Sequence, residues 1–119
     1  MTKILYVHHG KGIGGAPLSL LYTIRGVRDE FTPEVLFIHK GEIVKKFQRE
    51  GINCNVDSSI LDLSHTEVSN YSILNPMFWF RLAYQPISFA KFYLMCRKSN
   101  ADIVHLNTSS LVTLAIAAN

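Results

Sequence analysis

The sequence contains little cysteine and no closely spaced pair of cysteines. Cys54 and Cys96 are the two thiols among its 119 residues. A structural zinc site usually needs pairs at the CxxC spacing, so we do not expect the fold to depend on a metal. Two separate thiols in apolar surroundings suit a reducing compartment. We therefore expect both to remain unbonded and the protein to be cytoplasmic.

Long apolar runs are also missing. The apolar run that follows Lys3 is only about five residues long, which is too short for the core of a signal peptide. No stretch approaches the roughly 20 apolar residues that a membrane-spanning helix requires. A peripheral contact with a membrane surface stays open.

Neither sign of charge dominates. The chain has 12 Lys and Arg against 9 Asp and Glu, for a net charge of +3. Its densest basic cluster is Lys45, Lys46 and Arg49, which is typical of the solvated face of a helix. Nucleic-acid binding usually needs a denser basic stripe, so we do not expect it. Anionic ligands remain compatible with this charge.

What is present is a globular composition with alternating strands and helices. Hydrophobic residues make up 48% of the chain and charged residues 18%, and the length suits one domain. Apolar runs predict strands over 4–8, 34–38, 52–56 and 102–106, and helical spacing predicts helices over 16–28, 42–50, 76–98 and from 110 onward. This order predicts a doubly wound parallel sheet in three α/β/α layers, Rossmann-like, with strand order 3-2-1-4.

The helix expected over 76–98 has two unusual features. Pro86 lies in its middle, which predicts a kink or two abutting helices. The segment is also apolar on two faces. We expect the first face to pack on the core and the second to meet the rest of the protein or, alternatively, a membrane surface or lipid acceptor. The first face comprises Leu82, Pro86, Phe89, Tyr93 and Cys96, and the second Phe80, Tyr84, Ile87 and Leu94.

The strongest local signal is the glycine turn after the first strand, Gly10-Lys11-Gly12-Ile13-Gly14-Gly15. Glycines let a backbone approach a ligand closely, and the N–H groups that begin the next helix favour a phosphate or another anion. The turn matches the G-x-G-x-x-G dinucleotide fingerprint. The end of the second strand reads His39-Lys40, without the carboxylate that binds the ribose of NAD. This counts against NAD, whereas Lys40 leaves NADP open.

Four of the five histidines fall near the carboxyl ends of the expected strands, where open α/β sheets bind ligands: His8, His9, His39 and His105. No carboxylate or cysteine accompanies them, so we predict no metal site. His9 adjoins the glycine turn and is the best candidate to donate a hydrogen bond to a sugar or phosphate.

Two segments resemble a known enzyme family. Lys3-Ile4-Leu5-Tyr6-Val7, leading into Gly14-Gly15-Ala16-Pro17-Leu18-Ser19-Leu20, and Ala101-Asp102-Ile103-Val104-His105-Leu106-Asn107-Thr108-Ser109-Ser110 are similar to the retaining glycosyltransferases of the GT-B fold, family 4. The resemblance implies transfer of a sugar from a nucleotide-sugar donor to a glycan, lipid or small-molecule acceptor, with no cofactor. The N-terminal domain of that family binds the acceptor, and its glycine turn faces the donor diphosphate. This implies a site that includes Gly14, Gly15, Ala16, Asn107, Thr108 and Ser109, and Gly12 of the same turn is a further candidate.

The resemblance also implies that residues 1–119 lack a C-terminal, donor-binding domain. Family members carry their donor site, with a Glu-x7-Glu motif, in a C-terminal domain. Glu42 and Glu50 have that spacing here but lie on the expected second helix, so we interpret the match as coincidence. We expect residues 1–119 to form a truncated acceptor-side domain that is inactive alone. The alternatives are a stand-alone anion- or nucleotide-binding module and an NADP-dependent reductase domain.

Overall fold

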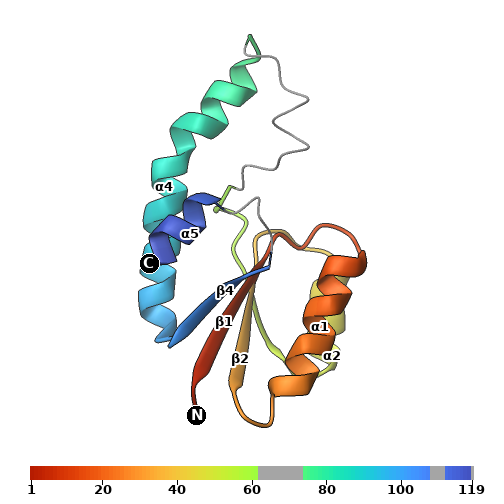
Figure 1. Cartoon of the computed structure of the whole chain (residues 1–119). Coiled ribbons are helices and arrows are strands. Elements are labelled where there is room, and N and C mark those ends of the chain that lie inside the picture. The colour runs from red at the N-terminus through yellow and green to blue at the C-terminus, as the bar shows by residue number, and fades with distance from the viewer. Residues whose placement is uncertain (62–73, 108–111, 119) are drawn as a thin grey trace.

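A computed structural model describes residues 1–61, 74–107 and 112–118 (Figure 1). Its elements are β1 (Lys3–His8), α1 (Gly15–Val27), β2 (Thr32–Phe37), α2 (Glu42–Arg49), β3 (Asn53–Val56), α4 (Pro76–Ser99), β4 (Ile103–Leu106) and α5 (Val112–Ala118). The predicted alternation of strands and helices is therefore confirmed, with ends displaced by two residues at most.

The four strands form one parallel sheet in the order β3-β2-β1-β4, as predicted. Tyr6 of β1 is paired with Val35 of β2 on one side and with His105 of β4 on the other. The two central strands are buried along most of their length because helices cover both faces of the sheet.

The helices make two outer layers. α1 and α2 pack on one face of the sheet, and α4 and α5 pack on the other (Figure 1). Alternate residues of β1 supply the two cores: Ile4 and Tyr6 face the first layer, whereas Leu5 and Val7 face the second. The doubly wound α/β fold is thus confirmed.

α4 begins as its sequence indicates. The side-chain carbonyl of Asn75 accepts a hydrogen bond from the Met77 N–H at 3.0 Å, and Pro76 occupies the first helical position. The helix ends at Asn100, which adopts a left-handed conformation with φ of 50°. Between these caps it runs through Pro86 as one helix, so the alternative of two abutting helices is wrong. The proline lies on an exposed side, where its ring meets no core packing.

The predicted core face of α4 is wrong in part: Phe89 and Cys96 pack against the core, but the other residues of that face are exposed. Leu82 and Tyr93 are 44% and 42% exposed, and the helix instead buries Gln85, Ser88 and Phe92. Hydrogen bonding explains this orientation. The Leu61 N–H donates to the Ser88 hydroxyl at 3.0 Å, and the Gln85 amide donates to the Leu61 carbonyl at 3.5 Å. The inward face of α4 is thus partly polar because it satisfies the backbone of the chain that follows β3.

Both cysteines are free thiols in the structure. Burial raises the pKa of Cys54 to about 11 and also raises the pKa of Cys96. Both thiols therefore stay protonated near neutral pH, which disfavours nucleophilic chemistry at either sulfur.

Candidate functional site

The glycine turn lies at the carboxyl end of β1 and leads into α1. Gly10 and Gly12 have φ of 83° and 73°, a left-handed conformation that favours glycine. A Cβ atom at Gly10 would lie 2.5 Å from the His39 carbonyl oxygen, so the two turns after β1 and β2 touch there. A Cβ atom at Gly12, Gly14 or Gly15 would meet nothing within 4 Å. The outer half of the turn therefore leaves open space beside its backbone.

The start of α1 offers backbone donors to that space. Gly14 caps the helix without any side-chain hydrogen bond, and Pro17 has no N–H. The first-turn donors are therefore the N–H groups of Gly15 and Ala16, both exposed residues. No acidic residue lies in this first turn, so the helix dipole leaves a positive end that suits an anion.

The side chain of His8 holds the backbone of the glycine turn from the buried side. This side chain is fully buried, and its Nδ1 accepts a hydrogen bond from the Gly10 N–H at 2.9 Å. Burial, and to a lesser degree the neighbouring His9, lowers the pKa of His8 to about 4. The ring is therefore neutral at physiological pH and carries its proton on Nε2. From the sequence, His8 is grouped with the other strand-end histidines and its support of the turn is not predicted, although its position two residues before Gly10 could have indicated it.

His9 holds the next residue of the turn in the same way. Its Nδ1 accepts from the Lys11 N–H at 3.0 Å, and its ring centroid lies 4.4 Å from that of His8. His9 is half-buried beside the open side of the turn. His105 is separate from this pair and exposed, and its ring lies 5.3 Å from that of Tyr6. Within the described residues, no three His, Cys, Asp or Glu side chains are grouped as a metal site would require.

Asn107 connects the end of β4 with the start of α1. Its backbone N–H donates to the Val7 carbonyl at 3.0 Å, and its side-chain amide donates to the Ala16 carbonyl at 3.3 Å. The structure thus brings together Asn107, Ala16 and the glycine turn, which the sequence expected to line one site. Their role in binding stays a prediction. Thr108 and Ser109 lie outside the described residues.

A hollow of about 540 Å³ adjoins the end of β2. It is lined by Lys40, Gly41, Glu42, Val44, Lys45, Gln48 and Val56. Gly41 touches the glycine turn, because a Cβ atom there would lie 2.8 Å from the Gly10 carbonyl oxygen. The hollow therefore borders the same edge of the sheet, and its charged lining residues are two lysines and one glutamate. Glu42 and Glu50 each pair with a different cation: Glu42 with Lys45 at 3.1 Å, and Glu50 with Arg25 at 2.5 Å.

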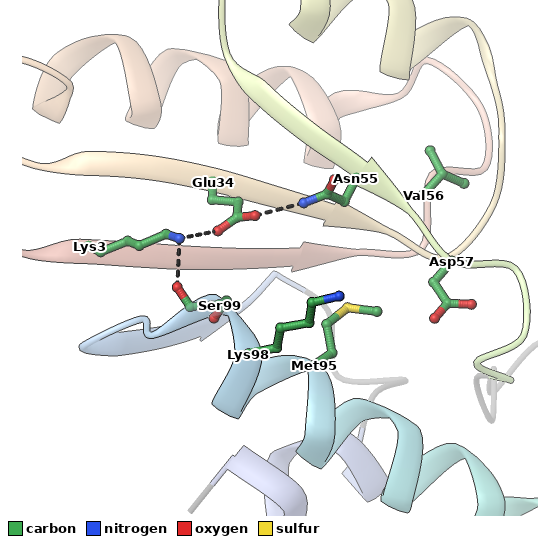
Figure 2. Close-up of a pocket in the computed structure, with 8 residues that line it drawn as sticks. All are labelled: Lys3, Glu34, Asn55, Val56, Asp57, Met95, Lys98 and Ser99. Atoms are coloured by element: carbon green, nitrogen blue, oxygen red, sulfur yellow. Dashed lines mark hydrogen bonds and ion pairs between the residues drawn. The ribbon is translucent and has the colours of Figure 1, made fainter.

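A second cavity, of about 420 Å³, opens on the other face of the sheet beside the last turns of α4 (Figure 2). Its floor holds a buried carboxylate, Glu34, whose two oxygens are both engaged. The Lys3 ammonium lies 2.7 Å from one oxygen, and the Asn55 amide donates to the other at 2.7 Å. Lys3 also donates to the Ser99 carbonyl at 2.6 Å. These charges satisfy one another, so we interpret the cluster as a structural link between β1, β2, β3 and α4.

Replacing Glu34 with glutamine is expected to lower the free energy of unfolding by about 1–3 kcal/mol. The Asn55 amide can rotate to accept from the new side chain, but Lys3 loses its counter-charge. The loss of stability is moderate because the Lys3 side chain is 30% exposed, so water still solvates part of its charge. Urea denaturation measures the change. The matched control, Glu42→Gln, breaks an exposed pair and should cost about 0.5 kcal/mol or less. Equal costs would contradict a structural role for the buried cluster.

Comparison with known proteins identifies the fold. No protein-family model matches the chain, and no curated protein sequence is significantly similar to it. Among solved structures, the chain is similar to the crystal structure of Anabaena Alr3699/HepE in complex with UDP and glucose, with a TM-score of 0.62 and 22% sequence identity. The two proteins share a fold. The match covers 99% of this chain and 27% of HepE, so the chain spans about a quarter of that protein's length.

Proposed function

We propose that this chain is the acceptor-side, N-terminal part of a GT-B glycosyltransferase of the retaining, family 4 type. It would take part in moving a sugar from a nucleotide-sugar donor to a glycan, lipid or small-molecule acceptor, without a cofactor. One observation carries the proposal. An open glycine turn at the start of α1 is held against the end of β4, in a fold shared with a protein crystallised with UDP and glucose.

The chemistry of the turn supports this assignment. UDP and glucose are the two parts of a nucleotide-sugar, and the bond that is broken in transfer leaves negative charge on the diphosphate. The N–H groups of Gly15 and Ala16 and the positive end of α1 are suited to that charge. Gly12 and Gly14 leave room for it to approach. His9 and Asn107 add hydrogen-bonding side chains at the border of the same space.

In this proposal the turn is one wall of a cleft, and a second domain supplies the other. That domain would bind the base and ribose and neutralise most of the diphosphate charge. Preorganised electrostatic stabilisation is usually the largest contribution to catalysis. A single helix terminus contributes only about 0.3–1 kcal/mol when exposed. The 119-residue chain alone is therefore expected to transfer no sugar and to bind UDP with a dissociation constant above about 1 mM.

The test is a titration of the ¹⁵N-labelled chain with UDP, UDP-glucose and NADPH, followed by amide chemical shifts. We expect weak binding of UDP, with the largest shifts at residues 12–16 and at Asn107. Gly14→Val should abolish these shifts, because the new side chain fills the open space beside the turn without meeting another group. Gly26→Val is the matched control. It adds the same side chain at an open position near the far end of α1 and should leave the shifts unchanged.

Three outcomes would contradict parts of this proposal. Shifts that map away from the glycine turn would exclude the site. Sub-millimolar binding or any sugar transfer by the chain alone would show that it is a complete module. Tighter binding of NADPH than of UDP-glucose would favour a reductase domain, for which Lys40 offers a cation at the end of β2.

A further inference from the structure

α4 presents a second apolar face to solvent, opposite the face that packs on the sheet. Phe80, Ile87 and Leu94 follow one another at intervals of seven residues, so they lie along one side of the helix. They are 57%, 48% and 65% exposed. Ala83, Pro86 and Ala90, which fall between them, are exposed as well, and so is Trp79. We call this the outward face of α4. An exposed apolar stripe of this length is unusual on the surface of a globular domain and indicates a binding partner.

The net positive charge of the chain is concentrated on α4. α4 carries four of the twelve cationic residues and none of the nine acidic ones, which leaves eight cations and nine acids for the rest of the chain. The four are Arg81, Lys91, Arg97 and Lys98. α4 is therefore a strongly basic element in an otherwise nearly neutral chain, and its partner should be anionic.

Three of the four cations, Lys91, Arg97 and Lys98, border the outward face. Lys91 lies four residues after Ile87 and three before Leu94, and Lys98 lies four after Leu94. The Lys91 ammonium donates to the Tyr84 hydroxyl at 3.1 Å, and the Arg97 guanidinium lies 5.9 Å from the centre of the Tyr93 ring. Long basic side chains and tyrosines flanking an apolar stripe suit the boundary between lipid tails and headgroups.

We infer that the outward face of α4 docks on an anionic lipid bilayer, with its apolar side chains in the headgroup region and its cations on the lipid phosphates. A second copy of the chain fits the charges less well, because facing α4 helices would bring cations together without any carboxylate to pair with them. Figure 1 shows α4 reaching past the sheet, so its first turns can meet a flat surface without obstruction by the strands. No helix in the described part of the chain is long and apolar enough to cross a bilayer. This inference does not depend on the proposed sugar transfer.

Vesicle binding tests it, with Trp79 as the reporter. Trp79 is the only tryptophan in the chain and is 53% exposed on α4. Vesicles of phosphatidylcholine with phosphatidylglycerol should bind the chain in sedimentation and shift the tryptophan emission to shorter wavelength. Replacing Lys91, Arg97 and Lys98 together with glutamine should weaken binding about a hundredfold, since each surface cation contributes roughly a fivefold factor. The variant Phe80→Ser, Ile87→Ser, Leu94→Ser should weaken it at least tenfold.

A matched control separates local docking from net charge. The variant Arg28→Gln, Lys46→Gln, Arg49→Gln removes three exposed cations outside α4 and should bind as the unaltered chain does. Circular dichroism checks that each variant is folded. Equal binding to vesicles of phosphatidylcholine alone, an unchanged tryptophan spectrum, or equal losses in the control and the α4 cation variant would overturn the inference. A dimer detected by light scattering that disappears with the serine variant would assign the face to a second copy instead.

Discussion

The variant Gly10→Ala is expected to unfold with a free energy about 3 kcal/mol lower than that of the unaltered chain. Two costs combine. A residue with a side chain pays roughly 1–2 kcal/mol for the left-handed conformation that Gly10 adopts at φ of 83°. The new Cβ atom would also lie 2.5 Å from the His39 carbonyl oxygen, and overpacking of this kind costs about 1–3 kcal/mol. Because the contact is with backbone, the turns after β1 and β2 must separate to relieve it.

Two other glycines of the turn provide a graded control. Gly12→Ala carries the conformational cost without the clash, since φ is 73° and a Cβ atom there meets nothing within 4 Å. It should lose about 1 kcal/mol. Gly15→Ala has neither cost and begins a helix, so it should be neutral or slightly stabilising. Urea denaturation of the three variants gives the ranking. If Gly10→Ala lost no more stability than Gly12→Ala, the contact between the two turns would be refuted.

Acidification is expected to destabilise the fold through His8. The folded pKa is about 4, whereas a histidine in the unfolded chain titrates near 6.5. Between these values the unfolded state binds the proton and the folded state does not, so stability falls as the pH is lowered from about 6.5 to about 4 and this contribution then levels off. The difference between a pKa of about 6.5 and one of about 4 corresponds to about 3 kcal/mol. Its main cause is burial, which disfavours the charged ring, and the neighbouring His9 adds a smaller contribution. Protonation of Nδ1 would also remove the acceptor of the Gly10 N–H.

The measurement is the free energy of unfolding from pH 4 to 7 for the unaltered chain and for His8→Asn. The asparagine oxygen takes roughly the place of Nδ1 and still accepts from Gly10, but it does not titrate. That variant should lose stability at neutral pH, because it fills less of the core, and show a flatter slope below pH 6.5. His105→Asn removes an exposed histidine and should keep the original slope. If both variants kept the original slope of stability against pH, the pH dependence would arise from carboxylates such as Glu50, whose pKa is lowered by Arg25.

The pattern of apolar runs and glycines determined the order of strands and helices. β1 and β2 are continuous apolar segments, and such segments become buried parallel strands when helices separate them. Local chemistry determined the caps, because Asn75 and Pro76 act on the helix they begin. The glycine turn also follows from local sequence, since Gly10 and Gly12 occupy conformations that other residues avoid.

The tertiary structure decided how α4 is rotated and which groups meet at the sheet. Hydrophobicity alone would turn Leu82 and Tyr93 inward, yet Gln85 and Ser88 are buried because the backbone of Leu61, 24 and 27 residues away in the chain, needs their polar groups. The contact of Asn107 with Ala16 joins residues 91 apart, and the Glu34 cluster joins three strands and α4. Such pairings depend on distances that arise only once the sheet has formed, so a periodic pattern along one segment carries no information about them.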